Sequence, residues 1–325
     1  MTTLIIGAGL VGSQIARTLV EQGEIPVLMD AAIQADAIAE IVALDRIAVS
    51  KGDVLRPLDI TRVILDHNIT DIVHTAANPL LTLGAQRDPF SAIQLNIMGT
   101  VNVLEAAHVH KLRRVITASS SVLNHYMEGG EGPTSLLKEE AFPRPVTFYA
   151  ATKQAVENLG LNYARWCNVD FAAMRYAAVC GPWNGSGGGG PSNMFRSVVE
   201  RALSGEDAIV QATDIEWVYS KDAARATVLA LRADKLGSRI FNVTMDSITS
   251  PEEFAAALRK AIPHARIKLQ PIAEVDLSMR KHRGASDPTL AREVLGFVPV
   301  YDITAAVADM VCWLRERKVE SRQIS

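Results

Sequence analysis

Residues 3–12 read Thr-Leu-Ile-Ile-Gly-Ala-Gly-Leu-Val-Gly, a short apolar run followed at once by a turn rich in glycine. The run predicts a buried strand at Thr3–Ile6, and the periodicity that follows predicts a helix at Gly12–Gln22. A strand, a glycine turn and a helix in this order begin the βαβ unit of many α/β proteins. The stretch therefore indicates the class of fold before any other part of the chain is considered.

Each glycine of the turn has a separate physical role in a dinucleotide site. Gly7 permits the tight turn, Gly9 lets the backbone approach a pyrophosphate, and Gly12 lets the helix pack on the strand. The helix begins beside Leu10 and Val11, where free N–H groups would face the phosphates. The alternative is a tight strand–helix turn that binds nothing.

The same alternation continues through the first half of the chain. The later strands are predicted at Pro26–Met29, Ile47–Val49, Asp71–His74, Val115–Ala118, Phe171–Arg175 and Arg239–Val243. The later helices are predicted at Asp59–His67, Ala92–His110 and Tyr149–Trp166. Strict alternation implies right-handed crossovers and a parallel sheet, and strands that are apolar on both faces imply a sheet covered on both sides. The predicted fold class is α/β, a Rossmann-type doubly wound parallel sheet of about seven strands with a smaller C-terminal substrate-binding lobe.

The second half of the chain is less regular. A run of glycine and serine at 185–190 predicts a flexible loop, and helices are predicted at Met194–Leu203, after Ser250 and at Ile303–Arg317. We expect residues 1–175, with returning segments near 217–245, to form the dinucleotide-binding domain. Residues 176–216 and 246–325 would form the smaller lobe, closing over the sheet edge where ligands bind.

The composition excludes several other classes of protein. The 325 residues are 48% hydrophobic and carry a net charge of −3, without the basic stripe of a nucleic-acid-binding surface. No apolar run is long enough to span a membrane and no secretion signal begins the chain, so a cytoplasmic location is expected. The three cysteines are widely spaced, as in reduced thiols, and no cluster of residues has the spacing of metal ligands.

Residues after the second, third and fourth predicted strands indicate which dinucleotide binds. Asp30 ends the second strand, where a carboxylate accepts hydrogen bonds from the adenosine ribose and repels a 2′-phosphate, so NAD is favoured over NADP. Asp53 and Val54 would cover the adenine, although a turn aspartate is an alternative. Ala76 and Ala77 are small enough to lie close to the cofactor, or they simply pack.

Tyr149 and Lys153 indicate what is done with the dinucleotide. Residues four apart lie on one face of a helix, and an ammonium there lowers the pKa of a phenol from its ordinary value of about 10. A phenol that is partly ionised near neutral pH accepts a proton from a substrate hydroxyl while a nicotinamide takes the hydride. The alternative is a tyrosine packed under a solvated lysine.

With these parts in place, the chain resembles the extended short-chain dehydrogenase/reductases, in particular the NAD-dependent epimerase/dehydratase family. The resemblance extends over nearly the whole chain and includes His74–Ala77, Asn96–Asn102, Ala118–Ser121, Arg175 with Gly181-Pro182, Trp217–Asp222 and Phe241–Val243. Each motif alone is weak, but their order and spacing together are specific.

The resemblance implies a role for each matching residue. Tyr149 matches the family's catalytic base and Lys153 its partner, which also binds the nicotinamide ribose. Ser120, with Ser119 as the alternative, matches the hydroxyl that holds the substrate oxygen, and Asn96 matches the helix asparagine that supports the site. The resemblance also implies a homodimer formed through the helices near 92–110 and 149–166.

Several positions depart from the family pattern. The glycine turn is one residue shorter than is usual, and Val122–Tyr126 replaces the family's Val-Tyr-Gly after the serines. Ser121-Val122 stands where the family's dehydratases carry Asp-Glu, and the glutamate of its decarboxylases is also missing, which disfavours both reactions. Ile215 stands where nucleotide-sugar enzymes carry a diphosphate-binding arginine, and Glu216 follows it, with Arg280 or Arg283 as an alternative source of the positive charge.

These observations favour an NAD-dependent oxidoreductase that transfers a hydride between NAD and a secondary alcohol carbon of a sugar, a sugar acid or a similar hydroxylated small molecule. Ser119, Ser121 and Asn193 are candidate substrate contacts, although a helix cap is the alternative for Asn193. One alternative function is a sugar epimerase that retains the ketone and reduces its other face. Another is a non-catalytic NAD sensor, a class that tends to lose the tyrosine or the lysine.

Overall fold

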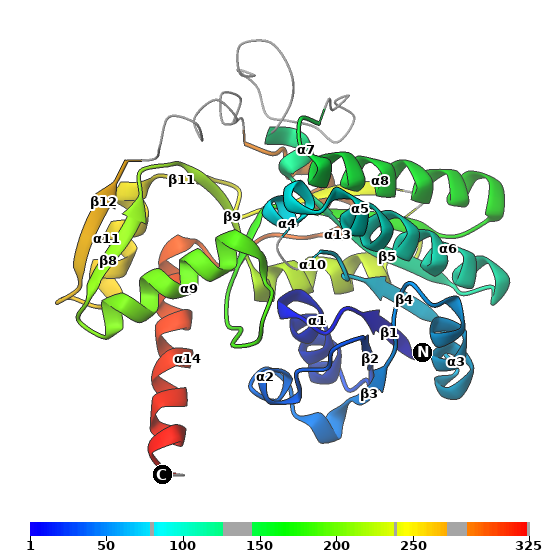
Figure 1. Ribbon diagram of the computed structural model, residues 1–325, viewed down its shortest axis with the longest axis horizontal. Helices are drawn as coiled ribbons and strands as arrows, with labels where there is room; N and C mark the ends of the chain where they lie inside the picture. The colour runs from blue at the N-terminus through cyan, green and yellow to red at the C-terminus, as the bar shows by residue number, and fades with distance from the viewer. Residues whose placement is uncertain (79–80, 126–144, 237–238, 272–284, 324–325) are drawn as a thin grey trace.

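The fold is built on a seven-stranded parallel sheet, seen in the computed structural model of residues 1–78, 81–125, 145–236, 239–271 and 285–323 (Figure 1). The strands are β1 (Thr3–Ile6), β2 (Val27–Asp30), β3 (Ala48–Lys51), β4 (Asp71–His74), β5 (Arg114–Ser120), β6 (Phe171–Tyr176) and β10 (Arg239–Val243). Their order is β10-β6-β5-β4-β1-β2-β3, and every pairing is parallel. The predicted doubly wound fold is confirmed, with its change of direction between β1 and β4.

Alternating side chains of the strands supply two hydrophobic cores, one on each face of the sheet. Ile5 packs in the first core with α1 (Leu10–Glu21) and α10 (Ser220–Arg232). Leu4 and Ile6 pack in the other core with α3 (Pro57–His67), α6 (Gly99–Val109) and α8 (Phe148–Cys167). Because both faces are covered, all four residues of β1 are buried, which explains why the sequence shows no alternation there.

The region predicted as one helix at 92–110 is divided, so that prediction is wrong in detail. It comprises the end of α5 (Pro89–Ile93), a π-helical segment at Gln94–Met98 and then α6. A π-helical turn lets one extra residue bulge from the helix, and such turns are frequent at functional sites. Here the bulge carries the buried side chain of Asn96. The neighbouring short helices are α2 (Ala35–Ala39), a 3-10 turn at Leu44–Arg46, α4 (Leu81–Arg87) and α7 (Val122–His125).

A smaller lobe follows β6 in the chain. It contains a three-stranded sheet of β7 (Ala178–Cys180), β9 (Ile215–Tyr219) and β11 (Ile248–Thr249), and a parallel pair of β8 (Asp207–Gln211) and β12 (Arg266–Gln270). The helices α9 (Gly189–Leu203), α11 (Pro251–Ala261) and α14 (Ile303–Gln323) pack on these strands. Figure 1 shows this lobe and the C-terminal helix on one side of the parallel sheet.

Packing in two places differs from the predicted division of the chain. Helix α13 (Thr289–Leu295) was assigned to the lobe, yet Ala291 and Leu295 pack in the core formed by α1 and α10. Conversely, Trp217 and Tyr219 belong to the lobe's own core, although their segment was assigned to the dinucleotide-binding domain. The chain therefore crosses between the two parts more often than its motifs indicate.

The described residues also bear on the remaining expectations. Within them no helix is long and apolar enough to cross a membrane, and no group of three or more His, Cys, Asp or Glu side chains is arranged to hold a metal ion. Cys167, Cys180 and Cys312 are all free thiols.

Candidate active site

A cavity of about 900 Å³ lies at the carboxyl edge of the parallel sheet, between the sheet and the lobe. Its walls come from the turns after β1, β2, β3, β4, β5 and β6, together with α8, the start of α9 and the loop between β8 and β9. The carboxyl edge beside the change of strand direction is where open α/β sheets bind ligands. The cavity has the size and position of a binding site for a dinucleotide and a second small molecule.

The glycine turn at one end of the cavity is packed too tightly for side chains at two of its three glycines. A Cβ on Gly7, whose φ is +105°, would lie 2.6 Å from the Ala76 nitrogen, and one on Gly12 would lie 1.9 Å from the Gly7 oxygen. Gly9 has no atom within 4 Å of where its Cβ would be, and it lines the cavity with Leu10 and Val11. The open side of Gly9 and the N-terminus of α1 fit a pyrophosphate.

The carboxylate of Asp30 lies beside this turn. Its Oδ2 accepts a hydrogen bond from the Ala8 backbone nitrogen at 2.9 Å, and its Oδ1 accepts one from the Ala32 nitrogen at 2.9 Å. Each carboxylate oxygen has a further lone pair, so Asp30 can still accept from ribose hydroxyls at the cavity wall. These residues therefore fit the adenosine half of NAD.

Four further residues predicted to bind the cofactor also line the cavity: Asp53, Val54, Ala76 and Ala77. The Oδ1 of Asp53 accepts from the Leu55 nitrogen at 2.9 Å, which fixes the turn after β3. The carbonyl of Val54 accepts from Asn102 Nδ2 at 2.9 Å, which holds that turn against α6. Asp53 therefore serves as a turn aspartate as well as a wall of the cavity.

Ser120, Tyr149 and Lys153 meet at the middle of the cavity. Ser120 lies close enough to affect the Tyr149 phenol, and all three residues line the cavity wall. The Lys153 ammonium lies 5.6 Å from the centre of the Tyr149 ring and donates to the Ala118 carbonyl at 2.7 Å. Helix α8 places the two side chains on one face, one turn apart, and its first turn is capped by Thr147.

Burial changes the acidity of this pair. It raises the pKa of the Tyr149 phenol, and the hydrogen bond from Ser120 opposes that rise. Burial lowers the pKa of Lys153 to about 8, while the Glu157 carboxylate acts in the opposite direction. The expected lowering of the Tyr149 pKa by Lys153 and an oxidised nicotinamide is not seen in the protein alone, because loss of water around the phenol has a larger effect than its neighbours in the protein.

Ser119 is held by a buried glutamate that the sequence analysis did not single out. The Ser119 Oγ donates to Glu157 Oε1 at 2.5 Å, and the same carboxylate receives Arg175 Nε at 2.8 Å and Nη2 at 2.7 Å. Glu157 lies one turn after Lys153 on α8, which is a spacing that the sequence does show. This arrangement leaves Ser120, rather than Ser119, as the partner of Tyr149.

Asn96 supports the site from behind and does not line the cavity. Its Nδ2 donates to Thr152 Oγ1 at 2.9 Å, and its Oδ1 accepts from the Asn78 nitrogen at 2.9 Å. The π-helical bulge thus ties the turn after β4 to α8 beside Lys153. Among the residues described, Asn96 contacts the site through these neighbours, in keeping with the supporting role that the resemblance implies.

The two remaining candidate substrate contacts differ. Ser121 lines the cavity, and its backbone nitrogen donates to the Tyr176 carbonyl at 2.9 Å. Asn193 is exposed, does not line the cavity and donates to the Gly187 carbonyl at 3.2 Å. It is not the cap of α9 either, because Gly188 holds that position. Tyr126, the last residue of the segment that replaces Val-Tyr-Gly, lies outside the described residues.

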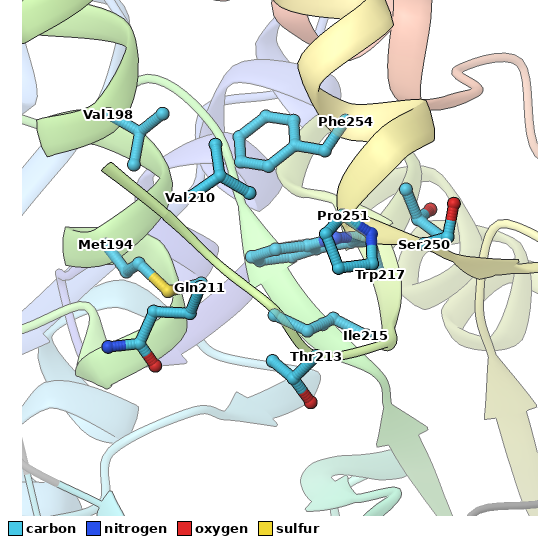
Figure 2. Close-up of a pocket in the computed structure, with 11 residues that line it drawn as sticks. Met194, Val198, Val210, Gln211, Thr213, Ile215, Trp217, Ser250, Pro251 and Phe254 are labelled. Atoms are coloured by element: carbon cyan, nitrogen blue, oxygen red, sulfur yellow. The ribbon is translucent and has the colours of Figure 1, made fainter. Parts of the chain in front are cut away.

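The far end of the cavity is apolar and acidic. Ile215 and Glu216 line it, and the Glu216 carboxylate accepts from the Ser286 nitrogen at 2.7 Å and from its Oγ at 2.8 Å. Beside it lies a small pocket with about 10 Å³ of free volume, enough for about one water molecule. Figure 2 shows Ile215 and Trp217 together in this pocket, with Phe254 opposite.

We refer to the glycine-rich loop at 183–190 as the strap. Its residues 186–190 line the cavity, as does Gln34. Gln34, which follows β2, accepts from the Ser186 nitrogen at 2.6 Å and donates to the Ser186 carbonyl at 3.4 Å. Asn184 donates to Glu40 at 3.4 Å. The sequence predicts only a flexible loop here, because residues more than a hundred positions apart make these contacts.

Comparison with known proteins agrees with this geometry. Residues 3–244 match the NAD dependent epimerase/dehydratase family. The UDP-glucose 4-epimerase of Mycolicibacterium smegmatis is 28% identical over 324 residues, which cover 98% of this chain and 99% of that protein. The mitochondrial L-threonine 3-dehydrogenase of Bos taurus is 26% identical over 220 residues, covering 66% of this chain but only 57% of the bovine protein.

Two solved structures have the same fold along their whole length. The UDP-glucose 4-epimerase of Thermotoga maritima has a TM-score of 0.83 at 23% identity, covering 98% of this chain and all of that one (100%). The L-threonine dehydrogenase of Phytophthora infestans has a TM-score of 0.81 at 24% identity, again covering 98% and 100%. The match over residues 3–244, together with the glycine turn and the cavity that follows it, shows that the chain belongs to the NAD-dependent epimerase/dehydratase family of extended short-chain dehydrogenase/reductases, whose cofactor is NAD.

Proposed function

We propose that the protein is an NAD-dependent dehydrogenase that oxidises a secondary alcohol carbon of a sugar, a sugar acid or a similar hydroxylated small molecule. The observation that supports this proposal is that Ser120, Tyr149 and Lys153 line the same cavity as the glycine turn, with the Lys153 ammonium 5.6 Å from the centre of the Tyr149 ring. A hydroxyl, a phenol and an ammonium in one cavity can together hold an alcohol and take its proton.

In the proposed reaction the substrate hydroxyl lies between Ser120 and Tyr149. Ser120 donates a hydrogen bond to the substrate oxygen, and the Tyr149 Oη accepts the proton of the hydroxyl. NAD bound at the glycine turn would supply the acceptor for the hydride of the carbon that bears this hydroxyl, and the alcohol would become a ketone. Tyr149 needs to be ionised to accept the proton, and burial raises its pKa, so the positive charge of Lys153 is required beside it.

The lining of the far end of the cavity favours a substrate without a diphosphate. A diphosphate in a protein site is usually met by arginine, lysine or helix N-termini. Among the described residues at this end, Ile215 is apolar and Glu216 is acidic, so neither supplies a positive charge for a diphosphate. Arg280 and Arg283 lie outside the described residues. The small apolar pocket beside Ile215 would accept a group about the size of a methyl.

Epimerisation is the second candidate function. The similarity to the Mycolicibacterium epimerase along nearly the whole chain favours it, because that protein is named for a sugar epimerisation. An epimerase would use the same Ser120, Tyr149 and Lys153 but would keep the ketone and reduce its other face. A third candidate, an NAD sensor without catalysis, is less well supported because both the tyrosine and the lysine are present.

A screen of alcohols with NAD separates the three candidates. A dehydrogenase accumulates reduced nicotinamide, seen by its near-ultraviolet absorbance, whereas an epimerase accumulates almost none but converts one sugar isomer to another. A sensor binds NAD and does neither. Failure of every sugar, sugar acid and nucleotide sugar to react, with NAD binding intact, would contradict the proposed dehydrogenase.

We also propose that the protein forms a homodimer through the helices near 92–110 and 149–166. Large apolar side chains are exposed on these helices, including Ile93, Met98, Val109 and Trp166, whose exposed fraction is 76%. A set of such side chains along adjacent helices is typical of a protein interface. Light scattering should give twice the chain mass, and Met98→Asp should reduce it to that of one chain.

A further inference from the structure

The two adjacent serines at the end of β5 have different partners because they belong to one strand. Neighbouring side chains of a strand point in opposite directions, so the two serines reach different residues. Ser119 lies beside Arg175 in the register of β5 and β6, and Ser120 lies beside Tyr176. The side chains of Ser119 and Arg175 meet at one carboxylate, that of Glu157 on α8.

Glu157 continues the functional face of α8. Tyr149, Lys153 and Glu157 follow one another at intervals of four residues, so each lies about one turn below the last. The side chains of Glu157 and Arg175 are 4% and 3% exposed. A carboxylate that is buried this far is kept only where it is paired, and removal of one partner is costly. Glu157 accepts at least three hydrogen bonds, from Ser119 and from two nitrogens of Arg175.

The charges around the Lys153 ammonium come from several elements. On its own helix it faces the Tyr149 phenol and the Glu157 carboxylate. The Arg175 guanidinium on β6 is paired with that carboxylate, and the His74 imidazole on β4 is close enough to be affected by the lysine. Since His74 is buried and its pKa is lowered to about 3, it is neutral. Among the described neighbours, the charge that acts on the lysine is therefore that of Glu157, which is itself paired with Arg175.

We propose that Glu157 is a positioning residue of the active site, which binds the Ser119 hydroxyl and, through its balance with Arg175, keeps Lys153 charged. This inference rests on the proposed function in so far as Lys153 assists Tyr149. The two roles come from one contact set: the carboxylate that binds Ser119 also supplies the negative charge one turn below the lysine. Ser120 alone is then left to meet Tyr149.

A direct titration of the Lys153 amine tests the charge role without any substrate. The protein is labelled with ε-¹³C lysine, and the Lys153 signal is identified by its loss in Lys153→Arg. In the full-length parent, Lys153 should titrate near pH 8. In Glu157→Gln the midpoint of the Lys153 titration should fall by roughly one pH unit, because a negative charge near the ammonium is lost. In Arg175→Gln it should rise by a smaller amount, because a like charge is lost.

The Lys153 midpoint should move in opposite directions in Glu157→Gln and Arg175→Gln, which a merely structural role of these residues does not produce. Loss of packing or of stability in both variants would leave Lys153 unchanged or move it in the same direction, and either outcome overturns the proposal. Glu105→Gln removes a surface carboxylate that binds Tyr163 and should leave the titration in place. Thermal unfolding of each variant shows whether it is folded.

Two variants that conserve the charge serve as controls for misfolding. Glu157→Asp and Arg175→Lys keep the charges, so neither should move the Lys153 titration by more than a small fraction of the shift in the matching Gln variant. If Glu157→Gln fails to fold, the comparison of Arg175→Gln with Arg175→Lys still decides the matter. Because the readout needs no turnover, it remains valid even if no alcohol is oxidised. Failure of the proposed dehydrogenase is thus distinguished from failure of this inference.

Discussion

In the glycine turn, one substitution should weaken NAD binding without changing the stability of the protein. In Gly9→Ala the new methyl meets no atom within 4 Å, and the backbone at Gly9 has a φ of −86°, which alanine adopts without strain. Alanine is poorer than glycine as the residue that precedes a helix, by about 1 kcal/mol, but it lowers the entropy of the unfolded chain by about 0.4–1 kcal/mol. These terms nearly cancel, so the free energy of unfolding should change by less than about 1 kcal/mol.

The same methyl lies on the side of the turn that faces the cavity. If the pyrophosphate of NAD rests against Gly9, it has to move outward to make room, and its hydrogen bonds to the start of α1 lengthen. Loss of one or two charge-assisted bonds costs about 1.5–3 kcal/mol each, which corresponds to a dissociation constant weaker by at least about tenfold. Isothermal titration calorimetry with NAD measures it directly.

Gly12→Ala is the matched control, with the opposite expectation. Its methyl would lie 1.9 Å from the Gly7 oxygen, where real contacts stay beyond 3.0 Å, so the strand or the helix has to move by about 1 Å. Overpacking of this kind costs about 1–3 kcal/mol or more, which denaturant unfolding detects. Unchanged NAD affinity in Gly9→Ala would refute the reasoning, as would a Gly12→Ala protein as stable as the parent.

Three further predictions follow from the site. Tyr149→Phe should lower the turnover of any substrate by about 10²–10⁴-fold while NAD affinity stays near that of the parent, as measured by kinetics and calorimetry; equal turnover would exclude Tyr149 as the base. Gln34→Ala removes both hydrogen bonds to Ser186, so NAD should dissociate roughly fivefold faster in a stopped-flow displacement, and an unchanged rate would mean that the strap does not retain the cofactor. His74 has its pKa lowered to about 3 by burial, and then by Lys153, so its neutral form stabilises the fold above pH 6.5 and that stability is lost as the pH falls toward 3. Urea unfolding at pH 6.5 and pH 5 should therefore show a loss in the parent that exceeds that in His74→Gln by about 2 kcal/mol, and parallel losses would contradict this.

Most of the fold follows from the sequence because local signals agree with one another. The predicted bounds of β1, β4 and β10 match the structure to the residue, and the capping box at Ser250 begins α11 as expected. The π-helical turn at Asn96 was not predictable from periodicity, because a single inserted residue leaves the apolar spacing of a helix almost intact. Nor does local sequence show that α13 returns to the core beside α10.

The sequence predicts three residues that the structure brings to one cavity, but not the residues that support them. Tyr149, Lys153 and Ser120 lie where the motif spacing places them, on one cavity wall. Glu157 was missed although it continues the same helix face, since a glutamate on a helix is usually solvated. Its partner Arg175 lies on another strand, so only the tertiary structure shows that the two charges neutralise each other. Long-range pairs of this kind leave no spacing that a single sequence displays.

The hydrogen bonds between Gln34 and Ser186 join the strap to the segment after β2 at the wall of the cavity. If these hydrogen bonds have to break before the cofactor can leave, the rate at which the strap opens, relative to catalysis, sets how the enzyme is supplied with NAD. With fast opening, each turnover consumes a fresh NAD molecule, and the rate responds to the ratio of oxidised to reduced nucleotide in the surroundings. With slow opening, the electrons taken from one molecule have to be returned to another inside the same chamber, and the protein becomes indifferent to that ratio.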